Sequence, residues 1–165
     1  MGQETTGRET AAQGGVVRTV DEWLAEAAAH EQAGRLDAAE QILAQVIEAR
    51  PRYAPAQHQA AIIAHKRQRP ADAIARLELA IAAAPDEPLF HRNICELYRS
   101  QGRLDEALVH GRRAVDLAPE DAGAHYNLGV IHYDRMEIDT AIIQARRALA
   151  LDPGMAAAHF ELSEA

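Results

Sequence analysis

Small and aliphatic residues recur along the chain with a period of 34 residues. One column of small residues contains Ala39, Ala73, Ala107 and Ala141. A second contains Ala27, Ala61, Cys95, Gly129 and Ser163, and a third contains Val46, Ala80, Ala114 and Ala148. Four prolines keep the same spacing, at Pro51, Pro85, Pro119 and Pro153. A fixed period of this length is typical of stacked repeats, in which each repeat buries its apolar face against its neighbours.

Two helices fit within each period. The pattern predicts first helices near residues 20–33, 54–67, 88–101, 122–135 and 156–165, and second helices near 36–50, 70–83, 104–117 and 138–151. Thr19 followed by Glu22 predicts a capping box at the first helix. Gly34 and Gly102 stand where the chain turns between the helices of a hairpin, because glycine reaches left-handed conformations at no steric cost.

These columns resemble the tetratricopeptide repeat (TPR) family, whose pattern is W-x2-L-G-x2-Y, then A-x3-F, then P. The third repeat contains His91, Ile94, Cys95 and Tyr98, followed by Ala107, Gly111 and Pro119. No repeat matches every column, and the second is the most degenerate. The resemblance covers residues 19–165 and implies an all-α, right-handed TPR-type α-solenoid of four helical hairpins plus a half repeat. Repeats are expected at 20–53, 54–87, 88–121 and 122–155, with the half repeat at 156–165 and a flexible polar tail at 1–18.

Composition narrows the class of protein. The chain has 165 residues, 48% of them hydrophobic, and a formal charge of −8, which argues against a sequence-independent nucleic-acid surface. One cysteine excludes an internal disulfide framework. No stretch approaches the ~20 apolar residues of a membrane span. We therefore expect a soluble, cytoplasmic protein without a membrane span or a nucleic-acid partner.

The last predicted helix contains Phe160 and Leu162, with no second helix after it to cover them. One interpretation is that the sequence is part of a longer, bacterial-type protein. The alternative is that this open end pairs with another copy of the chain.

Candidate chemistry is sparse. His91, His125 and His159 share one column, where stacking would hold their side chains parallel, so we interpret them as packing residues in the place of Trp23. Cys95 lies in a small-residue column and reads as a buried small hydrophobe. No catalytic set, metal site or cofactor motif is found, so the chain is not expected to be an enzyme and needs no cofactor.

The resemblance implies that the first helices line a concave groove that holds ligands. The candidate groove residues are His58, Gln59, Ile62, His65, Lys66, Arg92, Asn93, Glu96, Arg99, Tyr126, Asn127, Val130 and Tyr133.

Two features of this set suggest a ligand. Gln59, Asn93 and Asn127 form a row of carboxamides, which can pair with a peptide backbone, although asparagine in this column is also common to TPR repeats in general. His58, His65, Lys66, Arg92 and Arg99 form a basic cluster in an acidic chain, which suits a carboxylate or acidic peptide. The alternative for the cluster is a solvated face that Glu96 partly neutralises.

Three functions therefore remain open. The first is a protein–protein interaction module that binds an extended, acidic peptide or partner segment in the groove. The second is a self-assembling oligomeric scaffold that uses the open C-terminal end. The third is the substrate-recognition arm of an enzyme whose catalytic domain lies beyond residue 165.

Overall fold

The computed structural model describes residues 18–155, and helices are its regular elements. In chain order the helices are α1 (Val20–Gln32), α2 (Leu36–Ala49), α3 (Ala54–Lys66), α4 (Pro70–Ala83), α5 (Pro88–Ser100), α6 (Leu104–Leu117), α7 (Ala122–Asp134) and α8 (Ile138–Leu151). Each begins at the residue expected from the sequence and ends within one residue of the expected end. The predicted tail up to residue 17 and the predicted half repeat at 156–165 lie outside the described residues. Within the described part, no helix is both long and apolar enough to cross a lipid bilayer.

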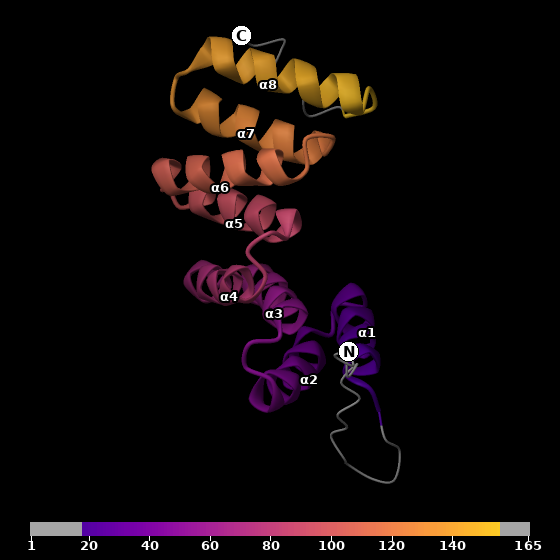
Figure 1. Cartoon of the computed structure of the whole chain (residues 1–165). Helices are drawn as coiled ribbons and strands as arrows, with labels where there is room; N and C mark the ends of the chain where they lie inside the picture. Colours follow the sequence, from indigo (N-terminus) through magenta and orange to yellow (C-terminus); the bar gives the residue numbers. More distant parts are fainter. Residues whose placement is uncertain (1–17, 156–165) are drawn as a thin grey trace, which may run out of the picture. The chain divides into compact units, whose positions relative to one another are not determined.

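The helices form two compact units, of which one ends at Ala83 and the other begins at Ala84. In the first unit α1 packs against α2 and α3 against α4, and α3 also contacts α1 and α2. In the second unit α5 packs against α6 and α7 against α8, and α7 also contacts α5 and α6 (Figure 1). The all-α class and the four predicted hairpins are therefore confirmed.

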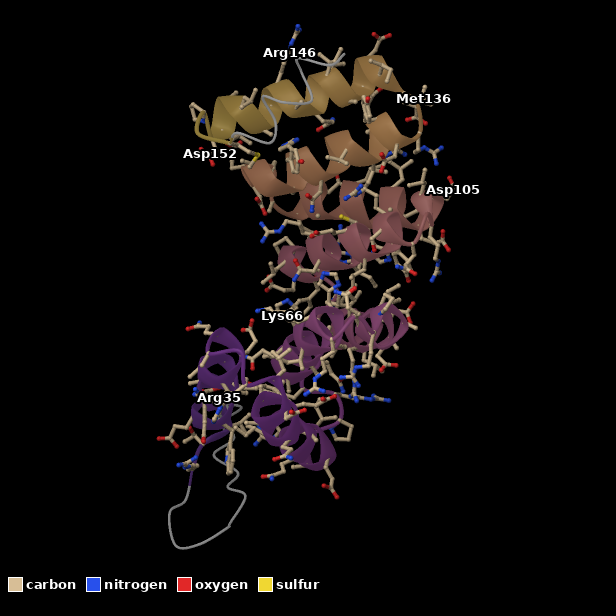
Figure 2. All side chains as sticks on the ribbon, turned by 180° about the vertical axis from the view of Figure 1, so that it is seen from behind. Arg35, Lys66, Asp105, Met136, Arg146 and Asp152 are labelled. Atoms are coloured by element: carbon tan, nitrogen blue, oxygen red, sulfur yellow. The ribbon has the colours of Figure 1, made fainter. Side chains whose placement is uncertain are left out.

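A single left-handed residue turns the chain in each hairpin. Gly34 and Gly102 have φ angles of 73° and 71°, as their positions in the sequence predicted. Gln68 (φ 59°) and Met136 (φ 62°) take the same conformation without glycine, and Met136 lies at the turn between α7 and α8 (Figure 2). The same pair of backbone hydrogen bonds closes each turn, as when Gly102 N–H donates to the Arg99 carbonyl and Arg103 N–H to the Tyr98 carbonyl, both at 2.9 Å. This Schellman arrangement satisfies carbonyl groups at the end of the first helix, which holds the turn in place even where a side chain is present.

Side-chain caps and prolines set the other boundaries. The Thr19 hydroxyl accepts from Glu22 N–H at 3.2 Å and the Glu22 carboxylate accepts from Thr19 N–H at 2.7 Å, which is the predicted capping box. Asp121 caps α7 by accepting from Gly123 and Ala124 N–H. Pro70 and Pro88 open α4 and α5, where a missing amide donor costs little.

The small-residue columns lie where the helices of a hairpin approach most closely. Ala39, Ala73 and Ala107 are fully buried. Gly129 lies on α7 against α8, where an added Cβ would stand 3.3 Å from Gln144 Cβ and 3.4 Å from the Ala141 carbonyl oxygen. A larger side chain at this position would therefore force the two helices apart.

Cys95 occupies the same column on α5 and is fully buried. Burial, and then the charge of the neighbouring Glu96, raise the pKa of its thiol from 9.0 to about 12. The thiol donates to the Arg92 carbonyl at 3.0 Å and hydrogen-bonds with the Asn127 side chain. A protonated, inaccessible thiol of this kind is a packing group, because the thiolate is the nucleophilic form of cysteine.

We expect Gly129→Leu to lower the free energy of unfolding by about 1–3 kcal/mol, because the leucine overpacks the contact between α7 and α8. Ala150→Leu, at an exposed position on α8, is the matched control and should be nearly neutral. Urea unfolding monitored by circular dichroism checks both variants. Equal stability of Gly129→Leu and the wild type would contradict the close approach at this column.

Stability should fall as the pH rises above about 9, because the unfolded chain then ionises the Cys95 thiol while the folded chain keeps it protonated. The contribution of this group is about 1 kcal/mol per pH unit between its unfolded and folded pKa values. Urea unfolding at pH 7 and pH 10 should show a smaller alkaline loss for Cys95→Ala than for the wild type. The same loss in both proteins would show that the thiol does not cause it.

Candidate functional site

The candidate groove residues divide between the two units. His58, Gln59, Ile62, His65 and Lys66 lie on α3 in the first unit. The other eight lie on the first helices of the second unit, with Arg92, Asn93, Glu96 and Arg99 on α5 and Tyr126, Asn127, Val130 and Tyr133 on α7. Contacts between α5 and α7 bring this second set together.

In the second unit, both arginines of the set form ion pairs across the α5–α7 boundary. Arg92 Nη1 donates to an Asp121 carboxylate oxygen at 2.8 Å, beside the N-terminus of α7. Arg99 Nη1 donates to Asp134 at 3.2 Å, at the other end of α7. The two pairs tie α5 to both ends of α7, and about a third of each side chain stays exposed.

The first unit has an equivalent ion pair with the charges exchanged. Lys66 on α3 pairs with Glu31 on α1. Two periods of 34 residues later, the same two positions contain Asp134 and Arg99. Lys66 is labelled near the end of α3 in Figure 2. The geometry of the contact between successive first helices is thus kept while the sign of each partner is reversed.

These pairs change the interpretation of the basic cluster. One interpretation of the sequence was that Glu96 neutralises part of it, but the carboxylates that pair with Arg92, Arg99 and Lys66 are Asp121, Asp134 and Glu31. Each guanidinium has five N–H donors, so a single ion pair leaves donors for a further acceptor. His65 is exposed on α3.

The remaining members of the set differ in accessibility. Val130 is 9% exposed, which makes it part of the core more than of a binding surface. Asn127 is half-buried and hydrogen-bonds with the Cys95 thiol, so its amide also contributes to the packing of α5 and α7. Asn93 and Tyr126 are half-buried, and Tyr133 is 36% exposed. In the first unit, Gln59 Oε1 is buried without a hydrogen-bond partner among the described residues.

A pair of linked hydrogen-bond contacts in the hairpins, called the relay below, was not predicted from the sequence. In each relay a buried side chain of the first helix contacts a proline carbonyl and also a side chain of the second helix. His125 Nε2–H donates to the Pro119 carbonyl at 3.0 Å, and its Nδ1 lies 2.8 Å from the Gln144 side-chain oxygen. His91 makes the equivalent contacts, at 2.9 Å each, with the Pro85 carbonyl and with His110 Nδ1.

The second repeat uses other side chains for the same relay: Gln57 Nε2 donates to the Pro51 carbonyl at 2.6 Å and Arg76 Nη1 donates to Gln57 Oε1 at 3.1 Å. The side chains of this column, which we interpreted from the sequence as packing residues, therefore also form a hydrogen bond with the carbonyl of the proline that follows the preceding helix. The constant offset of six residues between the proline and its partner was the available signal. His159, the fourth histidine considered, lies outside the described residues.

The hydrogen bonds of the relay compete with metal binding at these histidines. The ring nitrogens of His91 and His125 are taken up by hydrogen bonds within the hairpin. Across residues 18–155, no three His, Cys, Asp or Glu side chains converge as a set of metal ligands.

Comparisons with known proteins agree with this geometry. Two family models match the chain, one described as Tetratricopeptide repeat over residues 24–94 and one as TPR repeat over residues 95–135. A comparison with curated protein sequences finds no match.

Solved structures provide further likenesses. The chain is similar to pilF of Pseudomonas aeruginosa, with a TM-score of 0.80 and 21% identity over 87% of this chain and 66% of that one, which is just under two thirds of its length. It is similar to YrrB, described as a TPR protein with an unusual peptide-binding site, with a TM-score of 0.76 and 17% identity over 86% of this chain and 73% of that one. It also resembles the first TPR of Spaghetti bound to the HSP90 peptide SRMEEVD, with a TM-score of 0.66 and 21% identity over 67% of this chain and 88% of that one.

The two models together extend from residue 24, within α1, to residue 135, just after α7, so α8 is the helix that lies outside them. The hairpins, the period of 34 residues and these likenesses lead to one conclusion: the chain belongs to the tetratricopeptide repeat family.

Proposed function

We propose that this chain is a protein-interaction module that binds an extended peptide segment on the first helices of its second unit. The proposal depends on one observation: the contacting helices α5 and α7 together carry two carboxamides, two tyrosines and two guanidiniums. The peptide complex of the Spaghetti TPR and the peptide-binding site named for YrrB are precedents in proteins of the same fold. The proposed module is not catalytic, and we place it in the cytoplasm.

The side chains would act on different parts of the peptide. A carboxamide offers a donor and an acceptor together, so Asn93 and Asn127 can pair with a backbone that has no partners of its own. Tyr126 and Tyr133 offer apolar ring faces for side chains of the ligand. These contacts would set the register of the peptide without selecting a narrow sequence.

A preference for acidic peptides would come from Arg92 and Arg99. Both are already paired, so a ligand carboxylate would have to share each guanidinium with Asp121 or Asp134. Partly exposed pairs of this kind are worth about 0.2–1 kcal/mol each, which a bidentate carboxylate contact can match. The selection for acidic ligands is therefore expected to be moderate, and affinity to be micromolar, about −8 kcal/mol.

The test compares two labelled peptides of one apolar sequence, the first with glutamate and the second with glutamine at alternate positions. Fluorescence anisotropy should show weaker binding of both peptides to Asn93→Ala, by roughly five- to tenfold, because one backbone pairing is lost. Asp134→Asn should tighten binding of the glutamate peptide alone, because it frees Arg99. Arg99→Gln should weaken the glutamate peptide alone.

Arg112→Gln, at an exposed position on the second helix α6, is the matched control and should leave both affinities unchanged. Circular dichroism confirms that each variant is folded. Unchanged binding in Asn93→Ala and Arg99→Gln together, or chemical-shift changes confined to the second helices, would contradict this site. Mass that rises with protein concentration in the absence of peptide would favour a self-assembling scaffold instead.

A further inference from the structure

A cavity of about 460 Å³ opens on the second-helix side of the first unit. It lies between α2 and α4, with α3 as its floor. Leu43, Ile47, Ile63 and Leu79 supply its large apolar side chains. Leu79 is 48% exposed, so part of its side chain is accessible to a ligand. The cavity is separate from the α5 and α7 surface described above, because every residue that lines it belongs to the first unit.

Four alanines line this groove. Ala44 on α2, Ala60 and Ala64 on α3, and Ala75 on α4 all line it. Two periods later the same positions contain Arg112, Leu128, His132 and Ile143. Leu128 and His132 are buried in the second unit, and Leu128 reaches α6 close to Gly111. In the second unit the floor therefore has larger side chains, while the wall has Gly111 at the position of Leu43. The two units thus distribute apolar volume differently between the floor and the wall, and the groove described here is that of the first unit.

The charge at the mouth of the groove is uneven. Arg69 donates to Glu40 at 2.6 Å and lies 3.6 Å from Asp72, and Glu40 also pairs with Arg67 at 3.2 Å, so the charge of Arg69 has carboxylate partners. Arg76 donates to Oε1 of Gln57, a neutral group, and forms no ion pair with any carboxylate of the described residues. A ligand in the groove would therefore meet one positive charge that still lacks a counterion.

The floor and walls favour a helical ligand over an extended one. The floor consists of Ala60, Ile63 and Ala64, which offer no side-chain hydrogen bond. An extended strand would bury backbone N–H and C=O groups there without partners, whereas a helix satisfies its own backbone. A groove between two helices with an apolar floor suits the apolar stripe of an amphipathic helix, and the volume is within the usual range of ligand pockets.

We propose that the groove between α2 and α4 is a second docking site, which binds an amphipathic helix of a partner protein with its apolar stripe on Ala60 and Leu79 and a carboxylate against Arg76. The partner would present apolar residues at every third or fourth position, with a glutamate or aspartate at the edge of that stripe. This site does not depend on the peptide site on α5 and α7.

The probes for the test are two labelled synthetic helices of about four turns. Both have leucine along one stripe, and at its edges one has glutamate and the other lysine. Fluorescence anisotropy with the whole chain should show that the glutamate helix binds more tightly than the lysine helix, by about tenfold, since one charge-assisted hydrogen bond differs between them.

Two variants place the residues of the second unit in this groove. Ala60→Leu should weaken both probes by tenfold or more, roughly the effect of losing one buried apolar contact. Circular dichroism should show that this variant stays folded under the conditions of the assay, so lost binding could not be attributed to unfolding. Arg76→Gln should leave the lysine helix unaffected and remove the preference for glutamate.

Ala29→Leu, at an exposed position on α1, is the matched control for Ala60→Leu and should bind both probes like the wild type. Asn93→Ala, which tests the other surface, should also leave these probes unaffected. The proposal is overturned if neither helix binds the wild type, if Ala60→Leu binds as well as the wild type, or if Arg76→Gln keeps the preference for glutamate.

Discussion

Close approach of paired helices is the constraint on which the rest of this structure depends. It requires small residues at fixed points on both helices of a hairpin, and the columns through Ala39 and Cys95 supply them, with several members fully buried. The contact positions recur every 34 residues, and the left-handed residue that turns the chain in each hairpin recurs with the same spacing. Even Gln68 and Met136 adopt a left-handed conformation, since the backbone hydrogen bonds that close the turn over-determine it.

The repeats keep their geometry while changing the chemistry that maintains it. The carbonyls of Pro51, Pro85 and Pro119 each accept a hydrogen bond from the side chain six positions later, whether that side chain is glutamine or histidine. The ion pair between successive first helices likewise survives exchange of its charges, with Glu31 and Lys66 in one unit and Arg99 and Asp134 in the other. The position of the proline carbonyl and a fixed distance between helix faces constrain the kind of interaction, and several side chains can provide it.

The two surfaces proposed for binding differ in what they offer a ligand backbone. The first helices of the second unit have carboxamides, which can pair with the peptide groups of an extended chain. The groove of the first unit has alanine, leucine and isoleucine, which can hold only a segment whose backbone is already satisfied. On these two proposals, one chain of repeats would accommodate two classes of ligand, because its repeats differ at a few positions on otherwise equivalent helices.

The sequence by itself determined the helices, their boundaries, the left-handed turns at Gly34 and Gly102 and the small-residue columns, because local geometry and a strict period specify them. It also identified which residues belong to the first helices. Tertiary structure alone decided that Arg92 and Arg99 are paired with Asp121 and Asp134, that Val130 is buried and that the groove beside Ala60 stays open. These features depend on side chains about 30 residues apart in sequence meeting across helices. Such a meeting depends on rotamers and on the volumes of neighbouring residues, and no pattern along the chain encodes either.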